Sequence, residues 1–165
     1  FQAVPKGDRM ETVIEKAVEL GVYEIIPVEM KYCVVKLDAK KKAARLKRYQ
    51  AIAESAAKQS KRSRIPVVHD FMTYRDAMAY AKECDLCLVP YECAKGMEAT
   101  KDALTKIRDA KTISIMIGPE GGFAKEEIDA VKDCMQVVSL GSRILRTDTA
   151  AITTMSMVML ATEMQ

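Results

Sequence analysis

The sequence TISIMIGPEGGF, at residues 112–123, decides the fold of this chain. Its first half, residues 112–117, is mostly apolar and rich in β-branched side chains, which predicts a strand buried on both faces. Its second half holds three glycines within residues 118–122, so the strand must end in a tight turn. Glycine is favoured where the backbone adopts positive φ or lies close to a ligand. The glycines therefore indicate either two tight turns or, as we prefer, a ligand-binding loop.

Strands and helices alternate on both sides of this segment. Hydrophobic periodicity predicts strands at residues 23–30, 67–70, 85–90, 112–117 and 136–140, and helices at residues 8–20, 38–62, 74–82, 101–110, 125–133 and 147–163. Because the strands are apolar on both faces, they are typical of a parallel sheet covered by helices on both sides. No repeat or flexible linker divides the chain, so we predict a single α/β domain over residues 1–165.

Four local signals refine these boundaries. Asp8 and Glu11 have the spacing of a capping box at the start of the first helix, and Gly21 follows that helix as a stop signal. Asp38 is expected to cap the second helix. Pro27 cannot donate a hydrogen bond to a ladder, so we expect its strand to lie at an edge of the sheet or to have an irregular end.

The composition indicates a globular protein, since 49% of the 165 residues are hydrophobic and 30% are charged. No apolar run approaches the roughly 20 residues of a membrane span, and the first residues do not resemble a signal peptide, so we expect a cytoplasmic protein. The five cysteines include one CxxC, at Cys84 and Cys87, with no clustered histidine to complete a zinc site. We therefore expect neither a disulfide framework nor a bound metal. His69, the only histidine, has no evident partner and is interpreted as structural.

The net charge of +3 conceals a strongly basic segment. Residues 40–64 hold ten lysines and arginines against a single acid, Glu54, whereas the rest of the chain is mildly acidic. Such a run is usually a solvated helix face, but it also fits the phosphates of a nucleic acid, whose contacts are salt-dependent and fix position without reading sequence. Only Tyr49 adds an aromatic ring to this segment, so base stacking is not indicated there.

A second loop is expected at the same edge of the sheet as residues 118–122. Residues 140–149, LGSRILRTDT, lie between a strand and the start of the last helix. Ligands of open parallel sheets bind beyond the carboxyl ends of the strands, where both loops belong. Neither loop has the GK[ST] of a phosphate-binding loop or the G-x-G-x-x-G of a dinucleotide site. An anion-binding nest in a phosphate- or nucleotide-dependent enzyme is one alternative.

The two loops together resemble the C-terminal signature of a known family. IGPEGGF at residues 117–123, with LG, RILRT and TA within residues 140–150, is similar to the ribosomal RNA small subunit methyltransferase E family, the uracil-N3 methyltransferases of the SPOUT superfamily. Three earlier stretches resemble the same family: KGDRME at residues 6–11, KAVELGV at 16–22 and ESAAKQSKR at 54–62. Two positions differ, since Asp148 stands where the family usually has Glu, and Ser142 where it usually has Pro or Lys.

The resemblance implies an S-adenosylmethionine-dependent methyltransferase that modifies N3 of a uridine in small-subunit ribosomal RNA. It implies a deep trefoil knot near the C-terminus, which no periodicity or spacing would predict. It further implies a homodimer with an active site shared between subunits. Residues 1–165 are then expected to be a SPOUT-type methyltransferase domain, a fragment without the family's N-terminal RNA-binding barrel. The alternative is a catalytically silent module of the same fold that binds RNA or the cofactor.

The resemblance also assigns residues to binding roles. Those expected to hold the cofactor are Leu88, Val89, Pro90, Glu92, Ile117, Gly118, Pro119, Glu120, Gly121, Leu140, Gly141, Ile144, Leu145 and Arg146. Glu92 and Glu120 are expected near the ribose or the positively charged sulfur. Those expected to contact RNA are Lys41, Lys42, Lys47, Arg48, Lys58, Lys61 and Arg62.

Arg62, Arg146 and Asp148 are the candidate catalytic residues. A guanidinium can hold a phosphate or stabilise an anion that forms on the uracil ring, and a carboxylate can accept a proton. Each has a simpler interpretation as well. Arg62 fits a solvated helix end, Arg146 fits an ion pair with Asp148 or Glu120, and Asp148 lies in the first turn of a helix, where carboxylates are favoured.

Overall fold

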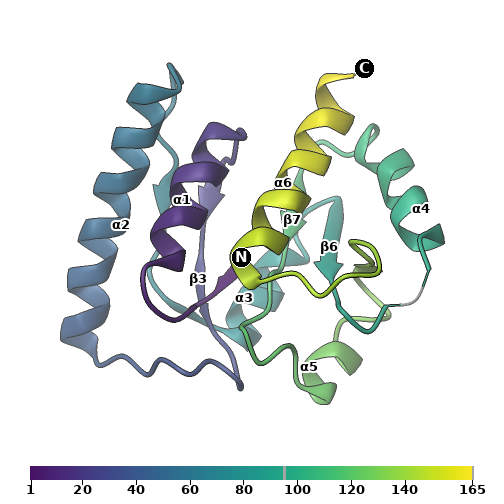
Figure 1. The fold of residues 1–165 in the computed structure, drawn as a ribbon, viewed down its shortest axis with the longest axis horizontal. Coiled ribbons are helices and arrows are strands. Elements are labelled where there is room, and N and C mark those ends of the chain that lie inside the picture. Colours follow the sequence, from purple (N-terminus) through teal and green to yellow (C-terminus); the bar gives the residue numbers. More distant parts are fainter. Residues whose placement is uncertain (95, 165) are drawn as a thin grey trace.

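The computed structural model describes residues 1–94 and 96–164 of the chain. Figure 1 shows short strands at the centre of the molecule with helices around them. In chain order the elements are β1 (Gln2–Ala3), α1 (Arg9–Glu19), β2 (Glu24–Ile25), β3 (Pro27–Glu29), α2 (Ala39–Gln59), β4 (Val67–Val68), β5 (Met72–Thr73), α3 (Tyr74–Ala81), β6 (Leu86–Pro90), α4 (Glu98–Ile107), β7 (Ile113–Ile115), α5 (Lys125–Asp129), β8 (Gln136–Val138) and α6 (Thr147–Glu163).

All strand pairs are parallel, as the sequence predicted. The strands form three ladders in the orders β1-β3-β5, β2-β4 and β7-β6-β8. The N–H of Ala3 donates to the carbonyl of Ile117 and the N–H of Ile117 donates to the carbonyl of Phe1, both at 2.9 Å. These two bonds place β1 beside the end of β7 and so join the ladders that contain β1 and β7. The α/β fold class with a parallel sheet is confirmed.

Pro27 interrupts a strand that lies inside its ladder. β3 is paired with β1 on one side and with β5 on the other, so the expected edge position is wrong. The irregularity is real, however, because β2 and β3 are separated at Ile26, directly before the proline that lacks a donor. The N–H of Gln2 still bonds the carbonyl of Ile26 at 2.9 Å, which carries the pairing across the break.

Helices pack on both faces of the strands. Ile25 belongs to a core cluster with Met10 and Ile14 of α1 and Tyr49 of α2, whereas the next residue, Ile26, belongs to a second cluster with α3. This alternation is what a strand buried on both faces requires. α1 contacts both α2 and α6, and Figure 1 shows it between them. The deep knot that the resemblance implies stays a prediction.

Most predicted helix boundaries are confirmed, but α4 spans Glu98–Ile107 and so lies three residues earlier than the predicted 101–110. Asp38 accepts the N–H of Lys41 at 2.8 Å and begins α2, as expected. The capping box at α1 is wrong, because Asp8 makes no side-chain cap and the Glu11 carboxylate instead pairs with Arg48 at 2.6 Å. α5 ends at Asp129, earlier than its pattern suggested, and β5 was not predicted, since two residues are too few for a periodic signal.

His69 has a partner that the sequence did not reveal. Its Nε2 atom lies 2.8 Å from a carboxylate oxygen of Glu24, and the hydroxyl of Tyr80 donates to the other oxygen at 2.5 Å. The hydrogen bond to Glu24 is the main reason that the pKa of Tyr80 is raised to about 12. Glu24 thus joins β2, α3 and the segment after β4, which supports a structural interpretation of the histidine.

The parallel strands divide the loops between two edges of the sheet. The edge where the strands end, called here the carboxyl edge, holds the loops that follow β3, β6, β7 and β8; the opposite edge is the amino edge. α2 begins beyond the end of β3 and returns to the start of β4, so it runs from the carboxyl edge to the amino edge (Figure 1). Residues at the two ends of α2 therefore lie at opposite edges of the sheet.

Arg62 follows the C-terminal end of α2 and connects it to the end of α1. Its guanidinium donates to the carbonyl of Val18 at 3.0 Å and to the carbonyl of Val22 at 2.8 Å. These acceptors lie in the last turn of α1 and just beyond it, where backbone carbonyls often lack intrahelical donors; the Val18 carbonyl also accepts the N–H of Gly21 at 3.2 Å. Arg62 therefore satisfies a helix terminus at the amino edge.

We predict that Arg62→Met destabilises the fold by about 1–3 kcal/mol, because the methionine keeps an apolar chain but removes the guanidinium that donates to the carbonyls of Val18 and Val22. Chemical denaturation measures the free energy of unfolding. Lys58→Met is the matched control, since Lys58 is an exposed cation near the same end of α2. Equal stabilities of the two variants would contradict this role of Arg62.

Candidate functional site

The two loops that the sequence singled out meet in one pocket at the carboxyl edge. The pocket has a volume of about 390 Å³ and lies between the segment after β7, the segment before α6 and the end of β6. Eleven of the predicted cofactor residues line it: Pro90, Glu92, Ile117, Gly118, Pro119, Glu120, Leu140, Gly141, Ile144, Leu145 and Arg146. A volume of this size falls within the range of small-molecule sites, about 300–1,000 Å³.

Three other predicted cofactor residues do not line the pocket. Leu88 and Val89 are completely buried in β6, and the Leu88 carbonyl accepts the N–H of Met116 within the sheet at 2.9 Å. Gly121 lies in the loop after β7, but a side chain there would meet the Cβ atom of Tyr32 at 2.9 Å. Protein packing therefore accounts for the glycine at position 121, in place of the ligand approach that we expected.

The other two glycines of this loop are also required by contacts within the protein. A Cβ atom on Gly118 would lie 2.8 Å from the Phe123 ring, so the turn closes over its own aromatic residue. Gly122 has a φ of +73° and faces the Glu92 carboxylate, where a Cβ atom would come within 2.9 Å of an oxygen. The glycines thus shape tight turns, and these turns form a wall of the pocket; the ligand-binding role of the loop stays a prediction.

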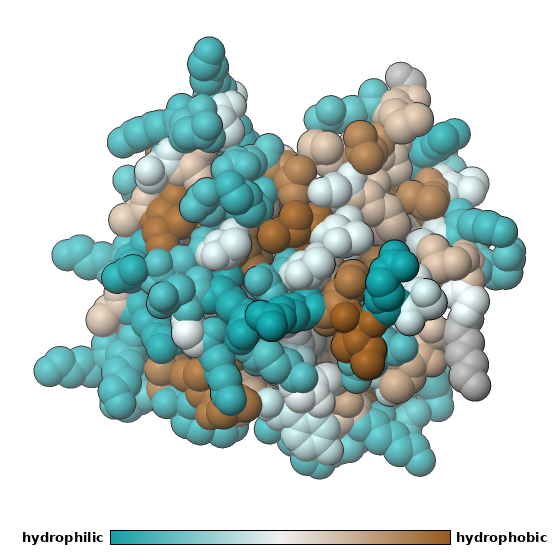
Figure 2. Space-filling view, viewed as in Figure 1, coloured by the Kyte–Doolittle hydropathy of each residue, from teal (hydrophilic) through white to brown (hydrophobic). Residues whose placement is uncertain are grey.

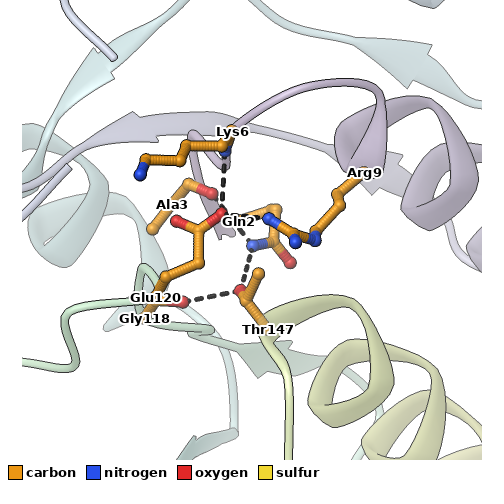
Figure 3. Close-up of polar contacts among 7 residues, drawn as sticks. All are labelled: Gln2, Ala3, Lys6, Arg9, Gly118, Glu120 and Thr147. Atoms are coloured by element: carbon orange, nitrogen blue, oxygen red, sulfur yellow. Dashed lines mark hydrogen bonds and ion pairs between the residues drawn. The ribbon is translucent and has the colours of Figure 1, made fainter. Parts of the chain in front are cut away.

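Glu120 connects the loop after β7 to the loop after β1 (Figure 3). One carboxylate oxygen accepts the backbone N–H of Lys6 at 2.8 Å and the guanidinium of Arg9 at 2.9 Å. Burial alone would raise the pKa of Glu120, but these hydrogen bonds outweigh it and the pKa is lowered. The carboxylate is therefore engaged by the protein itself.

Thr147 connects the two pocket loops to each other, as Figure 3 shows. Its hydroxyl donates to the carbonyl of Gly118 at 2.7 Å and accepts from the side-chain amide of Gln2 at 2.9 Å. The same amide nitrogen donates to the carbonyl of Ala3 at 2.9 Å. Thr147 and Gln2 are both buried. β1, the loop after β7 and the first residue of α6 are thereby held in one arrangement.

Sequence reasoning missed seven residues that line the pocket: Arg9, Tyr91, Gly122, Phe123, Arg143, Thr147 and Ala150. Gly122, Phe123 and Arg143 lay inside the quoted stretches but were given no role, whereas Tyr91 and Ala150 lie within two positions of residues that were predicted. Thr147 lay inside the quoted second loop but was given no role. Arg9 had no local signal, because it reaches the pocket only through the pairing of β1 with the end of β7.

The three candidate catalytic residues are not brought together within the chain. Arg146 lines the pocket and is exposed, and it makes no ion pair with Asp148 or Glu120 in the described part of the chain. Asp148 lies in the first turn of α6, and its buried Oδ1 atom has no hydrogen-bond partner among the described residues. Arg62 lies at the amino edge, so it does not join the other two.

The predicted RNA-binding residues are spread along α2. Lys42 pairs with Glu29 at 2.7 Å and Arg48 pairs with Glu11, so both are used to hold α2 against its neighbours. Lys41 is exposed near the carboxyl edge, and Lys47 is exposed further along the helix. Lys58 and Lys61 are exposed near the amino edge together with Arg62. The first half of α2 is therefore the part closer to the pocket.

Two other kinds of site were sought over residues 1–94 and 96–164. This part of the chain has no helix both long and apolar enough for a bilayer crossing. It also contains no group of three or more histidine, cysteine or acidic side chains that could hold a metal ion.

Comparison with known proteins places the chain in a family. The family model described as RNA methyltransferase domain matches residues 1–159. The chain is 34% identical over 165 residues to a ribosomal RNA small subunit methyltransferase E of Bacillus subtilis, covering 98% of this chain and 64% of the relative. It is 40% identical over 153 residues to the protein of that name from Mesomycoplasma hyopneumoniae, covering 91% of this chain and 63% of the relative. The chain thus spans less than two thirds of these relatives.

Solved structures share the fold. A putative methyltransferase from Legionella pneumophila, in complex with bound SAM, superposes with a TM-score of 0.89 at 34% identity, over 98% of this chain and 64% of that one. A ribosomal RNA small subunit methyltransferase E from Neisseria gonorrhoeae, bound to S-adenosyl methionine, has a TM-score of 0.75 at 33% identity, over 94% and 62%. Since a family model covers nearly its whole length and these relatives have its fold, the chain belongs to the RNA methyltransferase domain family.

Proposed function

We propose that this chain is the catalytic domain of an S-adenosylmethionine-dependent ribosomal RNA methyltransferase, and that N3 of a uridine in small-subunit ribosomal RNA accepts the methyl group. The observation that carries the proposal is the meeting of the two signature loops in one pocket at the carboxyl edge. The Neisseria gonorrhoeae relative, which is 33% identical and has the same fold, is bound to S-adenosyl methionine. The proposal includes action in the cytoplasm on ribosomal RNA.

The chemistry of the pocket fits an adenosine with a charged sulfur. Pro90, Leu140 and Leu145 supply apolar walls, and Ile144 is 85% exposed in a position where an adenine ring would cover it. Glu92 adds a carboxylate to the lining, which suits a positive charge. Neither loop carries a phosphate-binding motif, which disfavours the alternative of a nucleotide-dependent enzyme.

S-adenosylmethionine, when bound, supplies a methyl group on a positively charged sulfur. The residues of this chain must then position the uracil ring and manage its proton and its negative charge. Arg146 is exposed in the pocket lining and would stabilise charge on the uracil carbonyl oxygens. Asp148 follows the pocket residue Thr147 but does not itself line the pocket; we propose it as the acceptor of the N3 proton because its buried Oδ1 atom has no partner in the described part of the chain.

The proposed methyl transfer breaks one bond, forms one bond and moves one proton. The bond between sulfur and the methyl carbon breaks, a bond between N3 and that carbon forms, and the N3 proton passes to the Asp148 carboxylate. Arg62 has no part in this scheme, since its guanidinium is bonded to backbone carbonyls at the amino edge.

A homodimer through α1 and α6 also belongs to the proposal. Figure 2 shows apolar side chains gathered where these helices lie side by side, and a small apolar hollow there is lined by Val13, Ala17, Ile152 and Met155. Leu160 is 52% exposed further along α6. A second copy of the chain would cover these side chains.

The function is tested with the complete protein, S-adenosylmethionine and small ribosomal subunits from cells that lack the gene. Mass spectrometry should detect a single added methyl group on a uridine, at N3. Asp148→Asn should lower kcat by about a hundredfold or more if the carboxylate accepts the proton, and Asp148→Glu should restore most of the rate. Cofactor binding without any methylation would favour the silent module.

We predict that Thr147→Val weakens binding of S-adenosylhomocysteine by roughly tenfold. The valine leaves the Gly118 carbonyl and the Gln2 amide without their buried partner, which costs about 1–3 kcal/mol of stability. Part of this cost would appear as weaker binding, because the two loops of the pocket are then less well ordered. Thr147→Ser, which keeps the hydroxyl, should bind nearly as the wild type does. Calorimetric titration gives the affinities, and Thr162→Val near the other end of α6 is the matched control. Wild-type affinity in Thr147→Val would show that this hydroxyl does not order the pocket.

The dimer is checked by sedimentation equilibrium. We expect a two-fold mass for the wild type at micromolar concentration, and a shift toward the monomer in Ile152→Glu, because a charge would be buried in the apolar interface. A wild-type monomer would contradict this part of the proposal.

A further inference from the structure

Tyr32 is an exposed aromatic residue beside the cofactor loop. It lies in the segment between β3 and α2, at the carboxyl edge, and 45% of it is exposed. Gly121 of the loop after β7 faces it so closely that a Cβ atom there would lie 2.9 Å from the Cβ atom of Tyr32. The neighbours of Gly121 on both sides, Glu120 and Gly122, line the pocket. The tyrosine ring therefore stands next to the pocket but outside it.

The backbone on both sides of Tyr32 is anchored. The N–H of Lys31 donates to a carboxylate oxygen of the buried Glu127 at 3.0 Å. The N–H of Cys33 donates to the carbonyl of Met30 at 3.1 Å, and the Cys33 side chain is buried in the core. An exposed ring on a fixed backbone has little conformational entropy to lose on binding, which suits a recognition residue.

The Tyr32 side chain is partly open to a ligand, since 45% of the residue is exposed. No other aromatic ring contacts Tyr32 in the part of the chain that the structure describes. The Lys31 ammonium lies 5.6 Å from the ring centroid, and it also pairs with Glu126. The Lys31 ammonium therefore lies over the ring and its charge is engaged by Glu126. The exposed part of the ring still suits a nucleic-acid base, since bases stack on aromatic rings.

The charges around Tyr32 favour a polyanion. The nearby carboxylates are already engaged: Glu126 by Lys31, Glu127 by backbone amides, and Asp38 by the start of α2. Lys36 and Lys40, in contrast, are exposed on the segment that leads from Tyr32 into α2. Phosphates that follow this segment would meet cations and few uncompensated acids.

We propose that Tyr32 is a stacking platform for a base of single-stranded RNA next to the target uridine, with Lys36 and Lys40 near the adjoining phosphates. The proposal rests on the proposed function, since it names a contact of the same RNA substrate. A target base must leave its stack to reach the pocket, which separates it from its neighbours. A ring fixed beside the pocket would hold one neighbour and so keep the strand in place.

The test compares two exposed tyrosines in the complete protein. Tyr32→Ala should weaken binding of a fluorescent single-stranded oligouridylate by about tenfold, whereas Tyr32→Phe, which keeps the ring, should not. Tyr32→Leu keeps bulk against Gly121 without an aromatic face and should behave as the alanine variant does. Tyr23→Ala is the matched control, because Tyr23 is 61% exposed but precedes β2 at the amino edge.

Kinetics separate this contact from the chemistry. Tyr32→Ala should raise KM for RNA while kcat and the affinity for S-adenosylhomocysteine stay near the wild-type values. Unchanged RNA binding in Tyr32→Ala and Tyr32→Leu would overturn the proposal, and so would a loss explained by an altered oligomeric state. If the wild type binds the cofactor but methylates nothing, the proposed function fails while the binding comparison still decides the role of Tyr32.

Discussion

The pairing of β1 with the end of β7 is the constraint on which the site depends. β1 has only two residues, yet it bonds Ile26 on one side and Ile117 on the other. From this central position the Gln2 side chain reaches Thr147, which in turn holds Gly118. Residues 145 positions apart in the chain thus fix the distance between the two pocket loops. The backbone pairing of β1 and the buried Gln2 amide act together, because the two pocket loops are positioned by these contacts with β1.

The division into two edges decides which charges can act together. Arg62 and Arg146 were grouped because both fit an anion, but a parallel sheet sends α2 away from the edge where the pocket lies. Arg62 accordingly ends among the carbonyls of α1. The sequence predicted the strands, the longer helices and the two loops well, because those depend on local periodicity and on glycine. It could not predict the placement of Arg62, since that follows from the path of a helix across the sheet.

Contacts between distant segments explain the remaining differences. Glu11 has the spacing of a capping box, but Arg48 of α2 offers its carboxylate a charged partner, which a single helix cannot show. Gly121 looked like a gap for a ligand, whereas Tyr32 fills the space beside it. Arg9 reaches the pocket through the pairing of β1, and no local pattern marks it. In each of these three cases the residue contacts a segment that is distant in the sequence, and local sequence patterns do not reveal such contacts.

The charges that line the pocket are separated in a way that matters for the proposed chemistry. A positively charged sulfur would be repelled by Arg9, Arg143 and Arg146 if all three were free. Arg9 is compensated, because it shares a carboxylate oxygen of Glu120 with the N–H of Lys6. Glu92 faces Gly122 from the end of β6 and is left to meet a cation. Arg143 and Arg146 are exposed on the loop before α6, where the proposed RNA substrate would meet their charge. Under the proposed function, Glu92 would attract the cationic donor and Arg143 and Arg146 would attract the polyanionic acceptor, while Glu120 compensates the charge of Arg9.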